Sequence, residues 1–177
     1  MRKNGYAQLG PNSNFLYFSQ QDEGYGGNAI YQYDIARNKN NIIVPPSYEN
    51  YGALNLKVSN DGKYLAYLWS EIESPAKVYL INLQTRENIF LHELNKAELT
   101  FALDWSKDNK KIVVADNNDL FHIDIESKQV DIITLPENIT PFYLAVEDTN
   151  KILLSTRNTQ HYEILNVENL FTLEPLS

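Results

Sequence analysis

Short segments in which apolar and polar residues alternate follow one another along the whole chain, with turn-forming residues between them. This period of two is typical of β-strands, and no helical periodicity of useful length interrupts it. The pattern predicts four strands between residues 51 and 94, and four more in the same order between residues 99 and 136. These predicted strands are Leu54–Val58, Tyr64–Trp69, Val78–Leu83, Asn88–His92, Phe101–Trp105, Lys111–Ala115, Leu120–Ile125 and Val130–Leu135.

A turn phrase precedes the second strand of each group. Residues 59–67 read SNDGKYLAY and residues 106–114 read SKDNKKIVV. Looser copies occur near the two ends of the chain. The first apolar residue after each copy is Leu16, Leu65, Ile112 and Ile152, at intervals of 49, 47 and 40 residues, and an Asn or Asp stands four positions earlier in every copy: Asn12, Asp61, Asp108 and Asp148.

A second anchor supports the repeat independently. Four alternating segments each lead to an Asp or Asn that is followed by one more apolar residue. These polar residues are Asp34, Asn82, Asp124 and Asn166, at intervals of 48, 42 and 42 residues. Because a chance alignment of turn phrases would not carry a later motif along with it, the sequence predicts four copies of one unit.

Four antiparallel strands in forty-odd residues are the unit of a β-propeller blade. The sequence therefore predicts an all-β fold, a β-propeller-type array of four four-stranded blades in a single segment, residues 1–177. The predicted blades cover about 5–46, 51–94, 99–136 and 140–174. The phrase recurs because each blade needs the same turn, in which Asp-Gly and Asp-Asn pairs accept a positive φ. The Asp or Asn after the third strand is expected to bond to the backbone of the turn that follows.

The same residues resemble a known family. VSNDGKYLAYLW followed by VYLINLQTRE, and LDWSKDNKKIVVA followed by LFHIDIESKQ, are similar to the TolB-type propeller repeat. The resemblance covers nearly the whole chain and is sharpest in the second and third units. The family has Pro before the Asp-Gly pair, where this chain has Asn60 and Lys107, and the closing Gly of the family's third turn is absent.

The resemblance implies a ring of six or seven blades, so the chain is interpreted as a partial propeller. The predicted strands begin on an innermost one, Tyr6–Leu9, and end on an outermost one, residues 171–173, which leaves no strand to close the ring. We expect an open array or one completed by a second copy through its open blade edges, in preference to a closed four-bladed ring. Such an array exposes apolar blade faces, which favours a homodimer.

The resemblance also sets the expected function. Similar repeats form the sensor portion of bacterial membrane-bound winged-helix transcription regulators, so the leading expectation is a non-catalytic ligand- or protein-binding module in the periplasm. Its parent would be anchored in the inner membrane. The alternatives are the gating propeller of a prolyl-oligopeptidase-type serine hydrolase and a TolB-like periplasmic envelope protein. The fold alone does not choose among them.

Composition narrows the classes of partner. The net charge is −8 and the 15 Lys and Arg residues are scattered, so we expect no contact with nucleic acid. No run of eighteen apolar residues is present, and we expect no membrane span within this segment. The absence of cysteine excludes disulfides and thiolate chemistry.

The sequence suggests no enzyme, no cofactor and no metal site. Motifs of hydrolases, metallopeptidases and nucleotide-binding loops are missing. The histidines, His92, His122 and His161, occupy different positions in their units, and His122 is expected to be half-buried or to point outward from a strand. Acidic pairs such as Asp22-Glu23 are more often solvated than catalytic.

Nine of the twelve tyrosines lie between Tyr17 and Tyr79. Strand filling explains most of them, and a binding surface is the alternative for those in loops. In propellers the loops between strands two and three and between blades share one face, and here these are residues 19–28, 45–51, 70–77 and 135–141. The candidate ligand- or partner-binding residues in or beside these loops are Tyr25, Tyr48, Tyr51, Trp69 and Glu71. Trp105, in contrast, is expected to pack in the core.

Overall fold

A computed structural model of the protein describes most of the chain. The described residues are 6–48, 51–95, 102–136, 141–148, 151–156 and 162–166. They form fifteen strands and no helix, which confirms the predicted all-β fold. Accordingly, none of these segments provides a helix that could cross a membrane. The strands belong to two compact units, residues 1–97 and 98–177.

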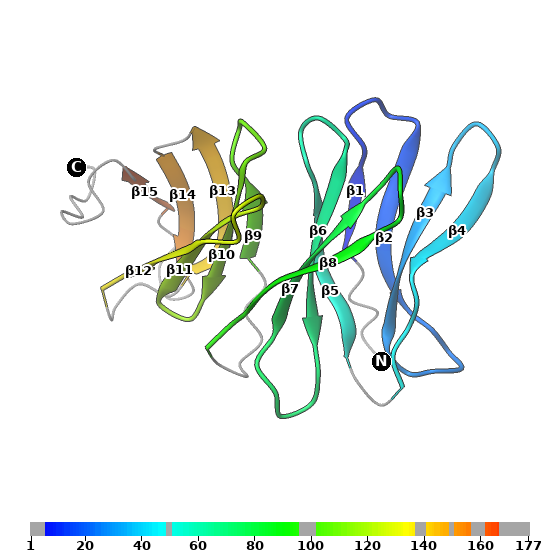
Figure 1. Ribbon diagram of the computed structural model, residues 1–177, viewed down its shortest axis with the longest axis horizontal. Helices are drawn as coiled ribbons and strands as arrows, with labels where there is room; N and C mark the ends of the chain where they lie inside the picture. The colour runs from blue at the N-terminus through cyan, green and yellow to red at the C-terminus, as the bar shows by residue number, and fades with distance from the viewer. Residues whose placement is uncertain are drawn as a thin grey trace. The chain divides into compact units, whose positions relative to one another are not determined.

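The first unit holds two four-stranded antiparallel blades, coloured blue to green in Figure 1. The strands of the first blade are β1 (Ala7–Leu9), β2 (Phe15–Gln21), β3 (Asn28–Asp34) and β4 (Lys39–Val44). Those of the second are β5 (Gly52–Val58), β6 (Tyr64–Ser70), β7 (Lys77–Asn82) and β8 (Asn88–Glu93). A single parallel pair, Asn28 with Gly52, joins β3 to β5 and so links the two blades.

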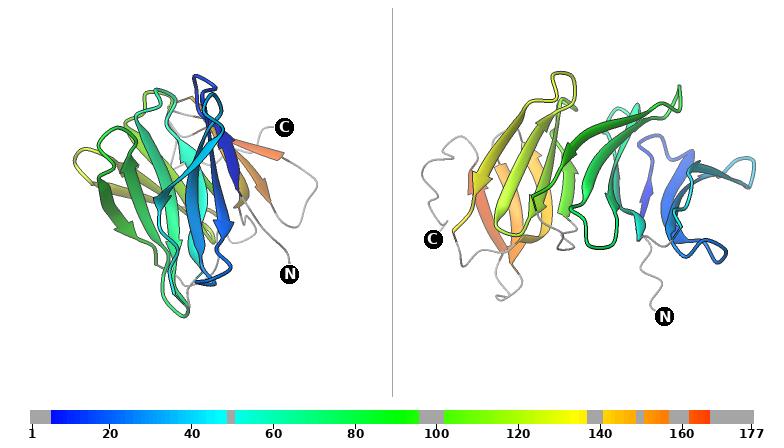
Figure 2. Two further views of the ribbon diagram at one scale, coloured as in Figure 1. Left: turned by 90° about the vertical axis from the view of Figure 1, so that its right-hand side faces the viewer. Right: turned by 60° about the horizontal axis from the view of Figure 1, so that its bottom comes forward.

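The second unit holds a four-stranded and a three-stranded antiparallel sheet. The strands of the four-stranded sheet are β9 (Ala102–Trp105), β10 (Lys111–Asp116), β11 (Asp119–Asp124) and β12 (Val130–Thr134). Those of the other sheet are β13 (Pro141–Asp148), β14 (Lys151–Thr156) and β15 (Tyr162–Asn166), as Figure 2 shows from two sides. The predicted last strand, residues 171–173, lies outside the described residues. The interpretation of the whole chain as one propeller segment stays a prediction.

The strand register confirms the repeat. In every blade the apolar anchor after the turn phrase pairs with the residue directly before the repeated Asp or Asn. The pairs are Leu16 with Tyr33, Leu65 with Ile81, Ile112 with Ile123, and Ile152 with Leu165. Because a shift of one residue would change every one of these pairs, this agreement means that the four groups of strands share one register.

The recurring turn phrase has one hydrogen-bond pattern in the second and third blades. The Ser59 hydroxyl donates to Asp61 Oδ1 (2.7 Å) and accepts from the Tyr64 N–H (3.0 Å), while Asp61 Oδ1 also accepts from the Lys63 N–H (3.1 Å). The matching bonds of the third blade join Ser106 to Asp108, Lys111 to Ser106 and Lys110 to Asp108, at 2.7, 2.8 and 3.0 Å. The same Ser and Asp therefore hold the turn in both blades.

The repeated Asp or Asn after the third strand accepts backbone N–H groups, as predicted. Asn82 Oδ1 accepts from Gln84 and Thr85 at 2.9 and 3.0 Å. Asp34 accepts from the Arg37 N–H, and Asp124 accepts from two backbone N–H groups. Four residues after each Asp or Asn, where the family has Gly, the chain has non-glycine residues with positive φ. They are Asn38 (50°), Arg86 (65°) and Lys128 (60°).

Each unit has its own core. The first is built around Ile30, Leu65 and Tyr67, and the second around Val113, Leu120 and Leu154. Trp105 is buried, which confirms its expected core role.

The expectation for His122 was wrong, because His122 is buried. It pairs directly across from Val113, and middle strands such as β11 are covered on both faces.

The strands of the first unit place its connections at two ends, visible at the bottom and top of Figure 1. The end that we call the loop end holds the β2–β3 loop, the β4–β5 connection and the β6–β7 loop, which are residues 22–27, 45–51 and 71–76. The opposite end, the turn end, holds the four tight turns, which are residues 10–14, 35–38, 59–63 and 83–87.

Candidate binding sites

The loop end carries the aromatic residues predicted from the sequence, and backbone bonds hold its segments together. Gly26 and Tyr48 form an isolated antiparallel bridge between the β2–β3 loop and the β4–β5 connection. The Asn28 N–H donates to the Tyr51 carbonyl at 2.9 Å. Residues 49 and 50 of this connection lie outside the described part of the chain.

Asp22 shapes the β2–β3 loop. Its Oδ1 atom accepts from the backbone N–H groups of Gly24 (2.9 Å) and Tyr25 (3.2 Å), and its carbonyl accepts from the Gly26 N–H. Gln21 Nε2 donates to the Gly26 carbonyl at 2.9 Å. These are the local bonds by which an Asp closes a turn. The acidic residue of this loop thus fixes the position of Tyr25.

Tyr25 and Tyr48 pack against each other and remain open to solvent. Their ring centroids lie 5.3 Å apart with an interplanar angle of 82°, the edge-to-face arrangement that aromatic pairs prefer. Tyr25 is 51% exposed and Tyr48 is 68% exposed. Neither is therefore a core residue. Tyr51 is also exposed at this end, so all three predicted tyrosines lie on the loop end.

Trp69 and Glu71 form a second group with Lys77. Trp69 Nε1 donates to Glu71 Oε1 (3.1 Å), and Lys77 Nζ donates to Glu71 Oε2 (3.2 Å). The hydrogen bond to Glu71 raises the pKa of Lys77. Trp69 is half-buried and packs against the core of the first unit. Since both Glu71 oxygens are engaged, this carboxylate orients the edge of Trp69.

Sequence reasoning missed Ile72, which is exposed in the same loop. Its signal is the order Glu71-Ile72-Glu73 outside any strand, because an apolar side chain between two charged loop residues has no sheet to pack on. The loop end therefore combines exposed aromatic and apolar groups with carboxylates.

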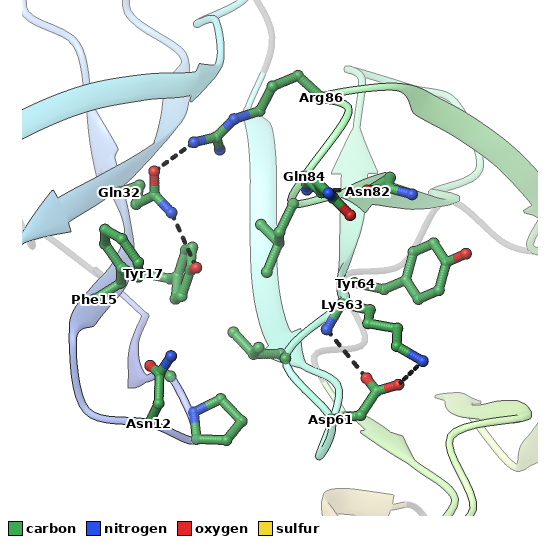
Figure 3. Close-up of a pocket in the computed structure, with 15 residues that line it drawn as sticks. Asn12, Phe15, Tyr17, Gln32, Asp61, Lys63, Tyr64, Asn82, Gln84 and Arg86 are labelled. Carbon is green, nitrogen blue, oxygen red and sulfur yellow. Dashed lines mark hydrogen bonds and ion pairs between the residues drawn. The ribbon is translucent and has the colours of Figure 1, made fainter.

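A pocket at the turn end was not predicted. It has a volume of about 400 Å³ and lies between the turns of the two blades, as Figure 3 shows. Its wall contains Phe15, Tyr17 and Gln32 from the first blade, and Tyr64 and Arg86 from the second. These five residues come from three strands, β2, β3 and β6, and from one turn, residues 83–87, so no short motif marks the site.

A hydrogen-bonded chain crosses this pocket from blade to blade. Gln32 Nε2 donates to the Tyr17 hydroxyl at 3.0 Å, and Arg86 donates to Gln32 Oε1 at 2.5 Å (Figure 3). At the other side, Lys63 Nζ lies 3.3 Å from Asp61 Oδ2. Hydrogen bonds from Ser59 and Lys63 outweigh the opposing effect of burial and lower the pKa of Asp61, so its carboxylate is charged at neutral pH.

Metal-binding chemistry has no support in the part of the chain that the structure describes. No group of three or more His, Asp or Glu side chains gathers there in a way that would hold an ion. His92 and His122 belong to different units, and His161 lies outside the described residues. In both described histidines, burial lowers the pKa, and that of His122 is lowered to about 4.

The fold has many relatives among solved structures. The WD40 repeats of RRP9 superpose with a TM-score of 0.74 at 10% identity, covering 96% of this chain and 49% of that one. A protein described as TolB from Agrobacterium tumefaciens gives 0.72 at 13% identity, covering 96% and 63%. The β-propeller domain of the trilobed protease from Pyrococcus furiosus gives 0.64 at 16% identity, covering 90% and 53%.

These similarities define the class of protein. The chain has a β-propeller fold of the kind found in TolB-like and WD40 proteins, and it spans about half to two thirds of the chains it resembles. At sequence identities of 10–16%, the similarity shows a shared fold and nothing further. Neither a protein-family model nor a curated protein matches the sequence.

Proposed function

We propose that the chain is a non-catalytic binding module whose partner contacts the loop end of the first unit. The observation that carries this proposal is the exposed Tyr25–Tyr48 pair, at 51% and 68% exposure, on segments held by backbone bonds. Tyrosine is enriched at interfaces because its ring buries apolar area while its hydroxyl keeps a polar contact. Segments fixed in advance lose little conformational freedom when a partner binds.

The acidic charge of the loop end indicates which kind of partner it would bind. Among the described residues of the loop end, Asp22, Glu23, Glu71 and Glu73 are acidic, while Lys77 at its edge is already paired with Glu71. Tyrosine rings also attract Lys and Arg side chains over their faces. The surface therefore suits a protein segment that combines basic with apolar or aromatic residues.

The non-catalytic assignment is supported by the way the loop acids are used. Asp22 accepts backbone bonds within its own loop, and Glu71 is held between Trp69 and Lys77. An acid or base for catalysis needs a free hydrogen-bonding position that faces a substrate. In this proposal both acids instead shape the loops that present the aromatic residues.

The finer role that we propose is the extracytoplasmic sensor portion of a bacterial transcription regulator, located in the periplasm and working through association. The TolB-type turn phrase supports it. The trilobed-protease propeller among the similar structures favours a second candidate, the gating propeller of a serine hydrolase, and the TolB structure favours a third, an envelope protein. The domains encoded beside this segment in its parent gene discriminate the three. A winged helix with a membrane span, a hydrolase domain, or neither would be found.

The proposed association is a homodimer formed through open blade edges. Light scattering over a concentration series tests it, because a monodisperse monomer near the chain mass of 20.4 kDa contradicts the homodimer.

The loop-end proposal predicts that replacing Tyr25 and Tyr48 together with Ser removes binding and leaves the fold intact. Their edge-to-face contact contributes only about 0.5–1.5 kcal/mol, so the melting temperature changes little. The measurement is affinity capture followed by identification of the retained protein and titration with that purified protein. Ile42→Ser, which alters an exposed apolar residue of β4 away from the loop end, is the control.

The expected result is a protein held by the wild type and by Ile42→Ser but at least about tenfold more weakly by the double variant. Its affinity should also fall as salt is raised, since the acidic loop end attracts it. Equal retention by the double variant would place the partner surface elsewhere.

A further inference from the structure

The turn-end pocket has the dimensions of a small-molecule site. Its volume of about 400 Å³ lies within the range of roughly 300–1,000 Å³ that such sites occupy. Pro11, Phe15, Val58 and Leu83 supply apolar wall, and Asn12 and Gln84 supply amides. Polar and apolar groups thus contribute about equally to the wall, so the pocket can contact the apolar body of a ligand and fix its orientation through polar groups.

Three polar side chains, those of Tyr17, Gln32 and Arg86, are linked on one side of the pocket. Gln32 and Tyr17 are both only 4% exposed, and they bond to each other. Gln32 Oε1 then fixes one nitrogen of the Arg86 guanidinium. The side chain of Arg86 is thereby held across the gap between the blades, in the position labelled at the top of Figure 3.

Arg86 still has donors to offer. A guanidinium carries five N–H groups, and the bond to Gln32 uses one of them. Among the residues that the structure describes, no carboxylate pairs with Arg86. Arg37 in the corresponding turn of the first blade differs, because its guanidinium is bound to Asp34 at 2.7 Å.

Tyr17 supplies a second unused donor. Its hydroxyl oxygen accepts from Gln32, while the hydroxyl hydrogen meets no acceptor within the described residues. Buried hydroxyl groups usually satisfy their donor, so this one points to a missing acceptor. Arg86 and Tyr17 lie on either side of Gln32, which suits a ligand with two acceptor groups.

The charge of the pocket selects a monoanion. Lys63 is neutralised by Asp61, which leaves Arg86 as the one unpaired charge in the wall. A dianion would be repelled by Asp61 and by the chain's net charge of −8, and it would have only Arg86 as a positively charged partner. The planar fork of a guanidinium matches a carboxylate, which it can bind through two parallel hydrogen bonds.

We propose that this pocket binds a small monocarboxylate with an apolar or aromatic body and a second acceptor group. Arg86 pairs with the carboxylate, Tyr17 donates to the second acceptor, and Phe15 and Leu83 contact the apolar body. Such a carboxylate is carried by a free N-acylated apolar amino acid or by the end of a peptide. Because the site joins both blades, an occupied pocket stabilises the first unit against unfolding.

The test uses N-acetyl-L-phenylalanine as the probe and its carboxamide as the uncharged match, titrated by calorimetry into the full chain. We expect the acid to bind at least about tenfold more tightly than the amide. Arg86→Gln should abolish that preference, and Tyr17→Phe should weaken both probes. Arg37→Gln is the matched control, since it removes an arginine that does not line the pocket, and it should leave binding unchanged.

Arg86→Lys keeps the positive charge, and it replaces Arg86→Gln in this test if the Gln variant does not fold. It should reduce the preference for the acid, because an ammonium lacks the planar fork. A tripeptide that ends in phenylalanine shows whether the natural ligand is a peptide end or a free N-acylated amino acid. Tighter binding of the tripeptide than of N-acetyl-L-phenylalanine identifies the ligand as a peptide end. Weaker or equal binding identifies it as a free acid. Equal affinity for acid and amide, no saturable binding, or a preference that survives Arg86→Gln overturns the proposal. The Tyr25→Ser/Tyr48→Ser variant should bind the probe normally, which separates this site from the loop end.

Discussion

Gly52 should be the glycine at which an added methyl group is most damaging. It begins β5 and forms the one parallel pair with Asn28 that joins the two blades of the first unit. Its φ of +73° is a conformation that side chains with a Cβ atom rarely adopt. A Cβ atom there would lie 2.5 Å from the Asn28 carbonyl oxygen and 2.8 Å from the Asn28 nitrogen.

The expected cost of Gly52→Ala is the sum of three effects. The positive φ costs about 1–2 kcal/mol in any residue other than glycine. To reach an ordinary contact of 3.4 Å, the Asn28 backbone must retreat by roughly 0.9 Å, which disrupts the bond from the Asn28 N–H to the Tyr51 carbonyl and costs about 0.5–1.5 kcal/mol. Disturbed packing of the buried start of β5 adds about 1 kcal/mol or more. The free energy of unfolding should therefore fall by about 2.5–4.5 kcal/mol.

Urea unfolding followed by far-ultraviolet circular dichroism measures this loss. Gly26→Ala is the matched control, since Gly26 has a φ of +80° and open space where its Cβ atom would lie. It should lose only the conformational part, about 1–2 kcal/mol. If Gly52→Ala is no more destabilising than Gly26→Ala, the close approach of β5 to β3 does not hold the blades together, and the reasoning is wrong.

Two further predictions concern pH and turn geometry. Burial, followed by the charge of Lys111, lowers the pKa of His122 to about 4 from an ordinary 6.5, so the unfolded chain takes up its proton first on acidification. Stability should be complete above pH 6.5 and fall by about 3 kcal/mol as the pH drops to 4, a loss that His122→Gln removes in urea titrations at several pH values. A wild-type chain with equal stability at pH 6.5 and pH 4.5 contradicts this. Lys128→Gly should raise the free energy of unfolding by about 0.5–1 kcal/mol, because φ is +60° at Lys128. Lys110→Gly is the control, and it should lower the free energy of unfolding by a similar amount, because φ is negative at Lys110. Equal effects of the two changes would show that φ does not determine the stability of these turns.

The repetitive part of this fold could be predicted from the sequence because it depends on local chemistry. A Ser and an Asp two residues apart close the turn with their own side chains, so the turn phrase alone reveals its position. Period-two alternation then fixes which residues of the following strand are buried. Strands predicted at Tyr64–Trp69 and Lys111–Ala115 accordingly differ by one residue at the end from β6 and β10.

Features that depend on contacts between blades could not be predicted in this way. Gln32 and Arg86 are 54 positions apart, and nothing near either residue indicates that they bond. Gly52 carries no local turn signal, although its backbone approaches Asn28 closely. His122 alternates like an outward strand residue, but a middle strand of a blade is covered on both faces. At such positions, burial and close contacts depend on which strand lies alongside. The local sequence does not show which strand that is.

The difference between repeated local bonds and individual contacts also separates the two ends of the first unit. Turns at the turn end are held by repeated Ser, Asp and Asn side chains, so the residues between them, such as Arg86, are free to differ from blade to blade. Loops at the loop end have no repeated capping residue, and each is fixed by its own bonds, as Asp22 fixes Tyr25. Because variation at either end leaves the strand register unchanged, both ends can carry binding groups without loss of the fold. A propeller chain can therefore hold a partner at one end and a small ligand at the other, and the two variants Tyr25→Ser/Tyr48→Ser and Arg86→Gln should separate these activities completely.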